Sequence, residues 1–563
     1  MKKIKYILYL AAISLLAGCG EDFLDQKQLY LKTDADFYKT PQDVADALTG
    51  AYSVLPSYGG ASNPTVMANL LSDDCFGGGG SGDITFHDLD KFTNSQADNY
   101  YPLWQEYYKG ILRVNKIIDR IGQAKYDNEA DKNQDLGEAY FLRAYFHFTL
   151  AKFFGNIPLI TDPAFAVVPQ AKPEVLYAQI ASDMKKAIEL MKTVNVNNIA
   201  SERAGHATKW AAEGMMARIF LFYTGYYNKT EMPLTEGGAV TKANVISWLD
   251  DCIANSGHDL TPDFRNFWPY SCVNMAMPNS YPYATNNNLS WVGDAGEKDS
   301  NGQLKNKETV FAIKYSTHGG WNLPTKVTYS NQVCLYMGLR IQEGLVPWSQ
   351  GWGAGPVNPQ LNQSFEDGDI RKKGSIIDVT DPEEGNVSTK YVWGSNQCMH
   401  ETGLWNKKYT SLQVKQGASY VGVFTILVPG SNTNNQLWNL QDEIILRFSD
   451  ILLMGAELGG PNAQAYFDRV RARVGLPSKP ASLENIKEER RHELAFEGVR
   501  YFDLLRWHDA EAAFAKVTNI PVKNSGVDEM YDASFRPETG GFLPIPETEI
   551  SLSSDVLKQN PGW

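Results

Sequence analysis

The sequence predicts a mostly α-helical protein in which helical pairs near both ends of the chain flank a large irregular block. Apolar residues recur every three or four positions over long stretches at both ends, which is the spacing of one helix face. Between about 261 and 440 this spacing is scarce, and Gly, Asn, Pro and aromatic residues take its place. The 563 residues are 43% hydrophobic and 21% charged, values typical of a folded globular protein.

Residues 1–18 have the organisation of a secretory signal peptide, with early lysines followed by an apolar run over 7–16. The sequence Leu16-Ala17-Gly18-Cys19 fits a bacterial lipobox, which is cut before the cysteine so that its thiol can be lipidated. Acyl chains hold a soluble body at a membrane, since each buried methylene contributes about 0.8 kcal/mol. We therefore predict a lipid attached to Cys19; the alternatives are an uncleaved helix, for which the run is short, and a plain secreted precursor.

The first part of the mature chain, about 19–260, is expected to hold paired helices. Pro41 suits a helix start, because its missing N–H costs nothing there. The expected helices are Gln42–Leu55, Trp104–Ile121, Leu136–Phe154, Pro173–Met191 and Lys209–Tyr227. Stacked pairs of this length indicate a tetratricopeptide-like array, although the strict repeat signature is not visible.

The loop-rich block at about 261–440 is expected to contain only short strands, such as Val310–Tyr315. Helices return in the last part, about 441–563, over Gln441–Leu458, Pro461–Val474 and Leu483–Trp507, before a tail. We treat 19–563 as one unit. A loop-rich block held between helical blocks is typical of function mounted on a rigid scaffold.

Charge and cysteine content exclude several classes of protein. The net charge is −13, and loss of the three signal lysines would make it −16. This argues against nucleic acid and against electrostatic membrane binding, which both need basic patches. The five cysteines after Cys19 are widely spaced without a CxxC pair, so neither a zinc site nor a redox motif is indicated. Disulfides and buried thiols both remain open.

Enzyme motifs are weak, and we predict no catalytic residue, metal or cofactor. His492-Glu493-Leu494-Ala495-Phe496 lacks the second histidine of a zinc protease. The run 77–82 formally fits GxGxxG, but the sequence predicts no strand before it and no helix after it, so a flexible loop is favoured. A glycosidase carboxylate pair stays open, because such pairs are defined by their separation in space.

Aromatic residues concentrate in the irregular block, where seven fall within 264–291 among several asparagines. Flat rings can stack on sugar rings while amides bind hydroxyls, and binding sites commonly mix such groups. Trp348 and Trp352 lie in further glycine-rich loops. The competing interpretation is that these aromatics pack the core of a block without long helices. The leading candidates for ligand stacking are Trp268, Tyr283, Trp291 and Trp321.

Several motifs resemble the hallmarks of the RagB/SusD family, in family order and over nearly the whole mature chain. The C-terminal hallmark is matched by Ile486–Trp507, in which opposite charges three or four residues apart are expected to pair on one helix. The other matching segments are Gly137–Phe146, Phe154–Ile160, Phe365–Arg371, Arg447–Glu457, Phe542–Ile550 and Gln559–Trp563.

The resemblance implies an outer-membrane lipoprotein with tetratricopeptide-like helices and a looped ligand-binding face. Such proteins sit on a SusC-like TonB-dependent transporter and capture nutrients, most often glycans. Glu21-Asp22 resembles the export signal of surface lipoproteins, and Asp74 lies in a loop that borders the site in relatives. We therefore expect non-catalytic capture of an oligosaccharide. A surface glycoside hydrolase on the same scaffold, or capture of peptides or another nutrient, is the alternative.

Overall fold

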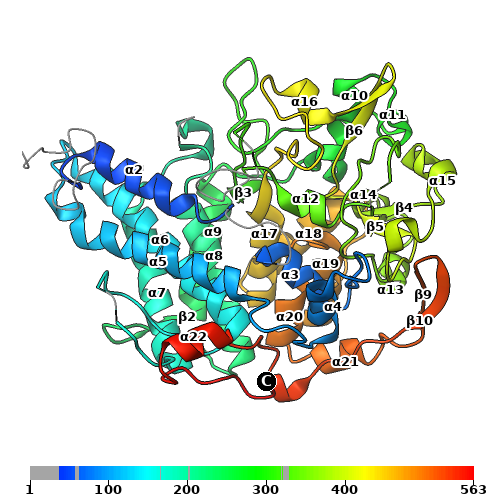
Figure 1. Ribbon diagram of the computed structural model, residues 1–563. Helices are drawn as coiled ribbons and strands as arrows, with labels where there is room; N and C mark the ends of the chain where they lie inside the picture. The colour runs from blue at the N-terminus through cyan, green and yellow to red at the C-terminus, as the bar shows by residue number, and fades with distance from the viewer. Residues whose placement is uncertain are drawn as a thin grey trace, which may run out of the picture.

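The computed structural model describes residues 37–56, 62–164, 166–200, 203–318, 320, 329–340 and 342–563. Two predicted functional residues, Cys19 and Trp321, lie outside this part of the chain. Figure 1 shows an array of long helices on one side and a block of loops and short elements on the other. The mostly helical fold class is thus confirmed.

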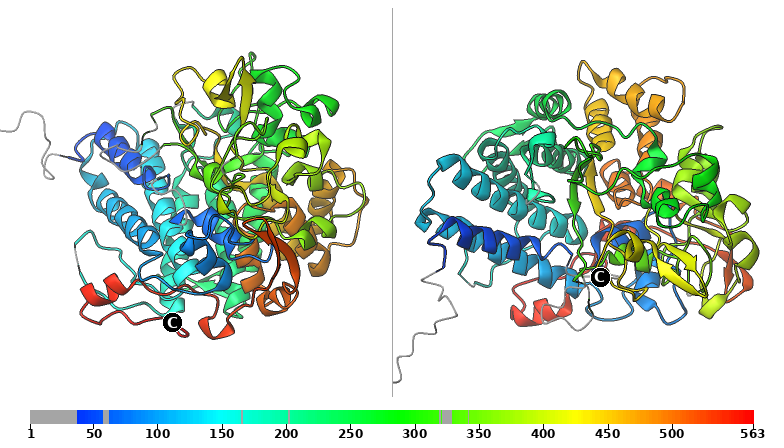
Figure 2. Two further views of the ribbon diagram at one scale, coloured as in Figure 1. Left: turned by 45° about the vertical axis from the view of Figure 1, so that its right-hand side comes forward. Right: turned by 90° about the horizontal axis from the view of Figure 1, so that it is seen from above.

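The helical array forms in chain order. It contains α2 (Pro41–Tyr52), α5 (Tyr101–Arg120), α6 (Glu129–Phe154), α7 (Pro173–Leu190), α8 (Lys209–Tyr226) and α9 (Lys242–Asn255). Helix α6 packs against α5 and α7, and α8 packs against α7 and α9, as expected for stacked helical pairs (Figure 2). Asn128 caps α6 by accepting from the N–H of Ala130, and Gly155 ends it. Helix α9 is not predicted by the apolar spacing of the sequence.

The C-terminal helices, except for the last, lie on the same side of the molecule as two short helices from the start of the chain, α3 (Pro64–Leu70) and α4 (Ile84–Lys91); the last lies against the helical array. The C-terminal helices are α17 (Phe448–Leu458), α18 (Ala463–Arg473), α19 (Leu483–Glu493), α20 (Arg500–Arg506), α21 (Ala510–Phe514) and α22 (Glu547–Leu552). The helix predicted over Gln441–Leu458 begins instead as a strand, β8 (Glu443–Arg447), before α17. β8 pairs antiparallel with β3 (Thr309–Ile313), and this pairing overrides the helical spacing.

The single helix predicted over Leu483–Trp507 is also wrong, because the chain breaks between α19 and α20. Phe496 and Gly498 have positive φ values of 67° and 70°, which no helix can accommodate. Asn69 of α3 holds both sides of the break: its side-chain amide donates to the Phe496 carbonyl and accepts from the Gly498 N–H. A long-range polar contact therefore stabilises a turn that the local pattern does not indicate.

The irregular block contains short elements between its loops. Besides β3, the described strands of the block are β4 (Ile376–Asp378), β5 (Leu404–Asn406), β6 (Gln413–Gln416) and β7 (Ser419–Gly422). Besides β8, the described strands outside the block are β1 (Glu231–Pro233), β2 (Ala239–Thr241), β9 (Ile520–Asn524) and β10 (Val527–Tyr531). Each described sheet has two antiparallel strands. The short helices are α10 (Val273–Ala276), α11 (Pro282–Asn286), α12 (Gln332–Tyr336), α13 (Pro359–Ser364), α14 (Arg371–Ser375), α15 (Val387–Lys390) and α16 (Val423–Leu427).

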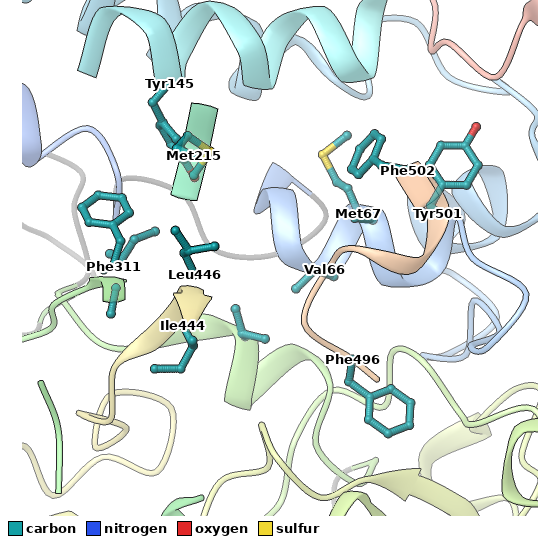
Figure 3. Packing of buried hydrophobic residues seen from close by; sticks show 14 of the residues in the cluster. Val66, Met67, Tyr145, Met215, Phe311, Ile444, Leu446, Phe496, Tyr501 and Phe502 are labelled. Carbon is teal, nitrogen blue, oxygen red and sulfur yellow. The ribbon is translucent and has the colours of Figure 1, made fainter. Parts of the chain in front are cut away.

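One continuous hydrophobic core joins the helical array to the irregular block. Figure 3 shows Tyr145 of α6 and Met215 of α8 facing Phe311 of β3 and Leu446 of β8. The Tyr145 and Phe311 rings meet edge to face, with centroids 6.0 Å apart. The β3–β8 pair, which brackets most of the irregular block in sequence, is thereby fixed against the array.

Most of the charged hallmark residues pair between elements, although Arg506 and Asp503 pair three residues apart along α20. Glu493 at the end of α19 accepts from Arg371, Arg447 and Arg473, which come from three other segments. Glu493 and all three arginine side chains are at most 2% exposed. Removing one partner of a buried ion pair typically costs 3–5 kcal/mol, because the other charge stays buried. These residues therefore fasten α19 to its neighbours, and for them the prediction of pairing along one helix is wrong.

The five cysteines after Cys19 are all buried, and none of them forms a disulfide. Burial raises the pKa of the Cys252 and Cys272 thiols, so both stay protonated at neutral pH. Among the described helices, none combines the length and apolar character needed to cross a bilayer.

Candidate functional site

Two of the predicted stacking residues lie in the core. Trp268 is 1% exposed and Tyr283 is 2% exposed. The ammonium of Lys408 lies 4.7 Å from the Trp268 ring centre, and that of Lys407 lies 3.9 Å from the Tyr283 ring centre. Because protein atoms already cover these rings, the prediction that they stack on a ligand is wrong. The core-packing interpretation holds for both.

The other candidates differ in position. Asp74 is 2% exposed, and its Oδ1 accepts from the Arg491 Nε and Nη2 at 2.8 and 2.6 Å, so it anchors α19 rather than bordering a binding face. Burial raises the pKa of Asp74 even beside this arginine. Trp291 is half-buried, with its ring edge-to-face to Phe424 at 5.7 Å, and its role in binding stays a prediction.

An aromatic pair on the irregular block makes a better platform. Tyr336 ends α12, Trp352 lies in the loop that follows, and their ring centroids are 4.4 Å apart at 60°. Both side chains are half-buried, so the pair is partly open to solvent. Phe86 of α4 supports Tyr336 from below in an edge-to-face contact at 5.9 Å. The pair is therefore both accessible and held in place.

Polar groups border this pair. We call the surface formed by the pair and these groups the Tyr336–Trp352 face; it consists of Ser81, Asp83, Tyr336, Arg340, Trp352, Asn396 and Gln397. The Arg340 Nη1 donates to Asp83 Oδ2 at 3.1 Å and to the Trp352 carbonyl at 2.8 Å. The Ser81 hydroxyl donates to the Gln397 side-chain oxygen at 3.1 Å. Ser81, Asn396 and Gln397 are exposed, and the Arg340 Nε donates to the Asn396 carbonyl at 3.4 Å, so Arg340 links this polar group to the Trp352 backbone.

Backbone contacts between glycine-rich loops fix the face. Gly79 N–H donates to the Gly353 carbonyl at 2.7 Å, and Ala354 N–H donates to the Tyr336 carbonyl at 2.8 Å. Gly78 has a φ of 64°, and a Cβ there would lie 2.3 Å from the Gly353 oxygen. Glycine is thus required for the loops to approach so closely. The glycine run at 77–82 is thus held against the Trp352 loop by backbone hydrogen bonds, and we call this contact the glycine clasp. The prediction of a flexible loop is wrong.

The sequence contained a partial signal for this site. Trp352 stands between Gly351 and Gly353, in one of the glycine-rich loops noted above, but its partner Tyr336 lies at the end of a short helix with no visible pattern. Backbone hydrogen bonds from the Trp352 and Ala354 N–H groups to the Leu335 and Tyr336 carbonyls bring the two residues together, and Phe86 of α4, about 250 residues earlier in the chain, packs against Tyr336. Local spacing could not indicate that contact.

The chemistry of the face suits binding. Its one carboxylate, Asp83, is paired with Arg340 and also accepts from the Gly80 N–H at 2.6 Å. Burial raises the pKa of Tyr336, and the negative charge of Asp83 raises it further, so the phenol stays neutral and can donate a hydrogen bond. Within the described ranges, no group of three or more His, Cys, Asp or Glu side chains is placed to hold a metal ion.

Two family models match the chain. One, described as "SusD family", matches residues 307–563, and the other, described as "Starch-binding associating with outer membrane", matches residues 22–221. The residues between them, 222–306, include the buried aromatic stretch around Trp268. Among curated proteins, SusD-like protein P2 of Formosa agariphila is 22% identical, with full coverage of both chains. A SusD-like protein of Bacteroides ovatus is 23% identical and covers 90% of this chain and 82% of its own.

Solved structures agree with this match. A structure named "Laminarin binding SusD-like protein" superposes with a TM-score of 0.71 at 25% identity, over 93% of this chain and all of its own. Surface glycan-binding protein A from Bacteroides fluxus superposes with a TM-score of 0.70 at 25% identity and the same coverage. The two family models match residues on either side of 222–306, and the solved structures cover nearly the entire fold. The chain therefore belongs to the SusD/RagB family.

Proposed function

We propose that this protein captures an oligosaccharide on the Tyr336–Trp352 face without cleaving it. The observation that carries the proposal is the half-exposed ring pair beside fixed hydroxyl, amide and guanidinium groups. Aromatic rings match the apolar faces of sugar rings, and the polar groups match hydroxyls. The names of two structural neighbours, one binding laminarin and one a surface glycan-binding protein, support a glycan as the ligand.

The arrangement of acids supports binding rather than hydrolysis. A glycosidase needs two carboxyl groups that flank the scissile bond, about 5–10 Å apart. The Tyr336–Trp352 face has one carboxylate, which is held in an ion pair with Arg340. Two structural neighbours are named as binding proteins as well.

We further propose that a lipid on Cys19 anchors the protein to the outer membrane, facing outward, and that the captured glycan passes to a SusC-like TonB-dependent transporter. The lipobox at 16–19 supports the anchor. The description of the matching N-terminal family model, which mentions association with the outer membrane, supports the location. The transporter partnership rests on family membership.

Calorimetric titration with laminarin oligosaccharides tests the binding site. Trp352→Ala should weaken binding roughly tenfold to a hundredfold, because loss of a stacking ring costs about 1–3 kcal/mol by analogy with base stacking. Trp248→Ala is the matched control, since Trp248 is a half-buried tryptophan on α9, outside the face. Product analysis after long incubation should show no shortened glycan. Equal affinities for wild type and Trp352→Ala, or release of shorter sugars, would contradict the proposal.

A further inference from the structure

Two adjoining cavities lie beside α6, α8 and α20, and none of the residues of the Tyr336–Trp352 face lines them. Both cavities are lined by Phe148, Lys152, Arg218 and Gly498. Each offers about 30 Å³ to the centre of a water molecule. One water needs about 10–15 Å³ on this measure, so the space suits a ligand of only a few atoms.

Lys152, in the last turn of α6, presents an unpaired ammonium to this space. In the described part of the chain, no carboxylate lies within ion-pair distance of its Nζ and no acceptor is hydrogen-bonded to it. The phenyl rings of Phe502, Phe153 and Phe148 surround the Nζ, with ring centres 4.4, 5.6 and 5.8 Å away. Lys152 is half-buried, and a charge drawn partly out of water in this way is costly unless it is paired.

The arginines around the cavities are already neutralised by acids. Arg490 bridges Asp450 and Asp503, at 2.6 and 2.8 Å. At the two ends of this chain of ion pairs, Arg218 contacts Asp450 and Arg506 contacts both Asp503 and Glu457. Three arginines thus balance three carboxylates, and Lys152 is left over. The remaining acid at the cavities, Glu497, is paired with Arg447 and Lys408.

Arg218 supplies a second unused donor. Its Nη1 donates to the Ile445 carbonyl at 2.8 Å and its Nη2 donates to Asp450 at 2.5 Å. Its Nε is buried without a hydrogen-bond partner. Buried donors without partners are rare, since each costs about 1–3 kcal/mol. An ammonium and a guanidinium N–H, both unsatisfied, therefore belong to side chains that line the same small space.

We propose that Lys152 and Arg218 bind a small monovalent anion, of the size of chloride or formate, in these cavities. The anion would pair with the Lys152 ammonium and accept a hydrogen bond from the Arg218 Nε. Phe148 and Phe502 line the space with apolar rings, and its small volume leaves room for only a few atoms. Without an anion, burial and the positive charge of Arg218 lower the pKa of Lys152 to about 7, so the ammonium loses its proton near neutral pH. A bound anion would keep it protonated.

Chloride NMR of the full mature protein, with formate as competitor, tests this proposal. Wild type should broaden the chloride signal. Added formate should reverse this broadening, because it competes with chloride for the same site. Lys152→Met removes the charge and Arg218→Lys removes the Nε donor, and each should weaken anion binding at least tenfold. Lys185→Met is the matched control, because Lys185 is exposed on α7 and pairs with Glu189; its affinity should equal that of wild type.

Thermal unfolding in sodium chloride, sodium formate and sodium gluconate at equal ionic strength gives a second measurement. Chloride or formate should raise the wild-type midpoint relative to gluconate, because an anion that binds only the folded state stabilises it. This gain should vanish in Lys152→Met and persist in Lys185→Met. If Lys152→Met does not fold, Arg218→Lys decides. Equal anion effects in wild type and Arg218→Lys, or no chloride broadening by wild type, would overturn the proposal.

Discussion

Tyr336 and Trp352 differ from the other aromatics of the irregular block in what covers them. Lysine ammonium groups lie over Trp268 and Tyr283, whereas the Tyr336–Trp352 pair is half-exposed and its nearest aromatic support comes from Phe86 on one side. Residue type alone does not separate the two groups, because both are aromatic and both lie in loops or short helices. Their roles diverge through the partners that the fold brings to them.

Substitutions at Tyr336 separate stacking from hydrogen bonding. Tyr336→Ala removes the ring and should weaken oligosaccharide binding about tenfold to a hundredfold. Tyr336→Phe keeps the ring and removes the hydroxyl, so binding should weaken only a fewfold, since one hydrogen bond contributes about 1 kcal/mol. Calorimetric titration of both variants checks this. Equal losses in the two variants would show that the hydroxyl, and not the ring, carries the contact.

Asp90, on α4 below the glycine clasp, should make stability depend on pH. It is 1% exposed and accepts from the Gly77 N–H at 2.7 Å and from the Tyr531 hydroxyl. Burial raises its pKa to about 6, above the ordinary value of 3.8. The folded state thus holds the proton more tightly than the unfolded chain. The ionised carboxylate costs stability above pH 6, and this cost shrinks as the pH falls from 6 towards 4.

Asp90→Asn should therefore raise the free energy of unfolding at pH 8, by at most about 3 kcal/mol for a pKa difference of two units. The gain should be much smaller at pH 4, where Asp90 is protonated in the folded state and partly protonated in the unfolded chain. Urea unfolding of wild type and variant at the two pH values measures it. A gain that does not change with pH would show that the effect is steric.

At the scale of elements, the clasp between the 77–82 loop and the Trp352 loop should control both stability and binding. Gly78→Ala places a Cβ 2.3 Å from the Gly353 oxygen at a positive φ, so it should lower the free energy of unfolding by more than about 1 kcal/mol. It should also weaken oligosaccharide binding by displacing Trp352. Gly82→Ala is the control, because a Cβ there meets nothing within 4 Å. If both variants bind and unfold alike, the clasp does not position the face.

The long helices were predictable from the sequence because one apolar face repeats along each of them. Helices α5, α6, α7 and α8 accordingly begin and end within a few residues of the prediction, apart from the polar first turns of α6. The break between α19 and α20 was not predictable, since it depends on Asn69 from the far end of the chain. The site depends in the same way on distant partners, which is why the predicted aromatics proved to be core and the ring pair was missed.

At the scale of the whole molecule, attachment to the membrane should depend on Cys19 alone. Cys19→Ala should give an unlipidated protein that fractionates away from membranes, because the acyl chains would be lost and the net charge of −13 disfavours anionic lipid surfaces. Metabolic labelling with a fatty acid, followed by fractionation, checks both effects. Unchanged membrane association of the variant would contradict the anchor.

In the whole molecule, we expect the oligosaccharide to bind at the Tyr336–Trp352 face. Its loops are mounted on a block that the β3–β8 pair and the shared core join to the helical array. A crystal structure of the protein with a laminarin oligosaccharide tests this most directly. We expect an intact sugar chain with one ring stacked on Trp352 or Tyr336 and hydroxyls bound by Arg340 or Gln397. A sugar bound elsewhere with this face empty, or a cleaved chain in the site, would contradict the account.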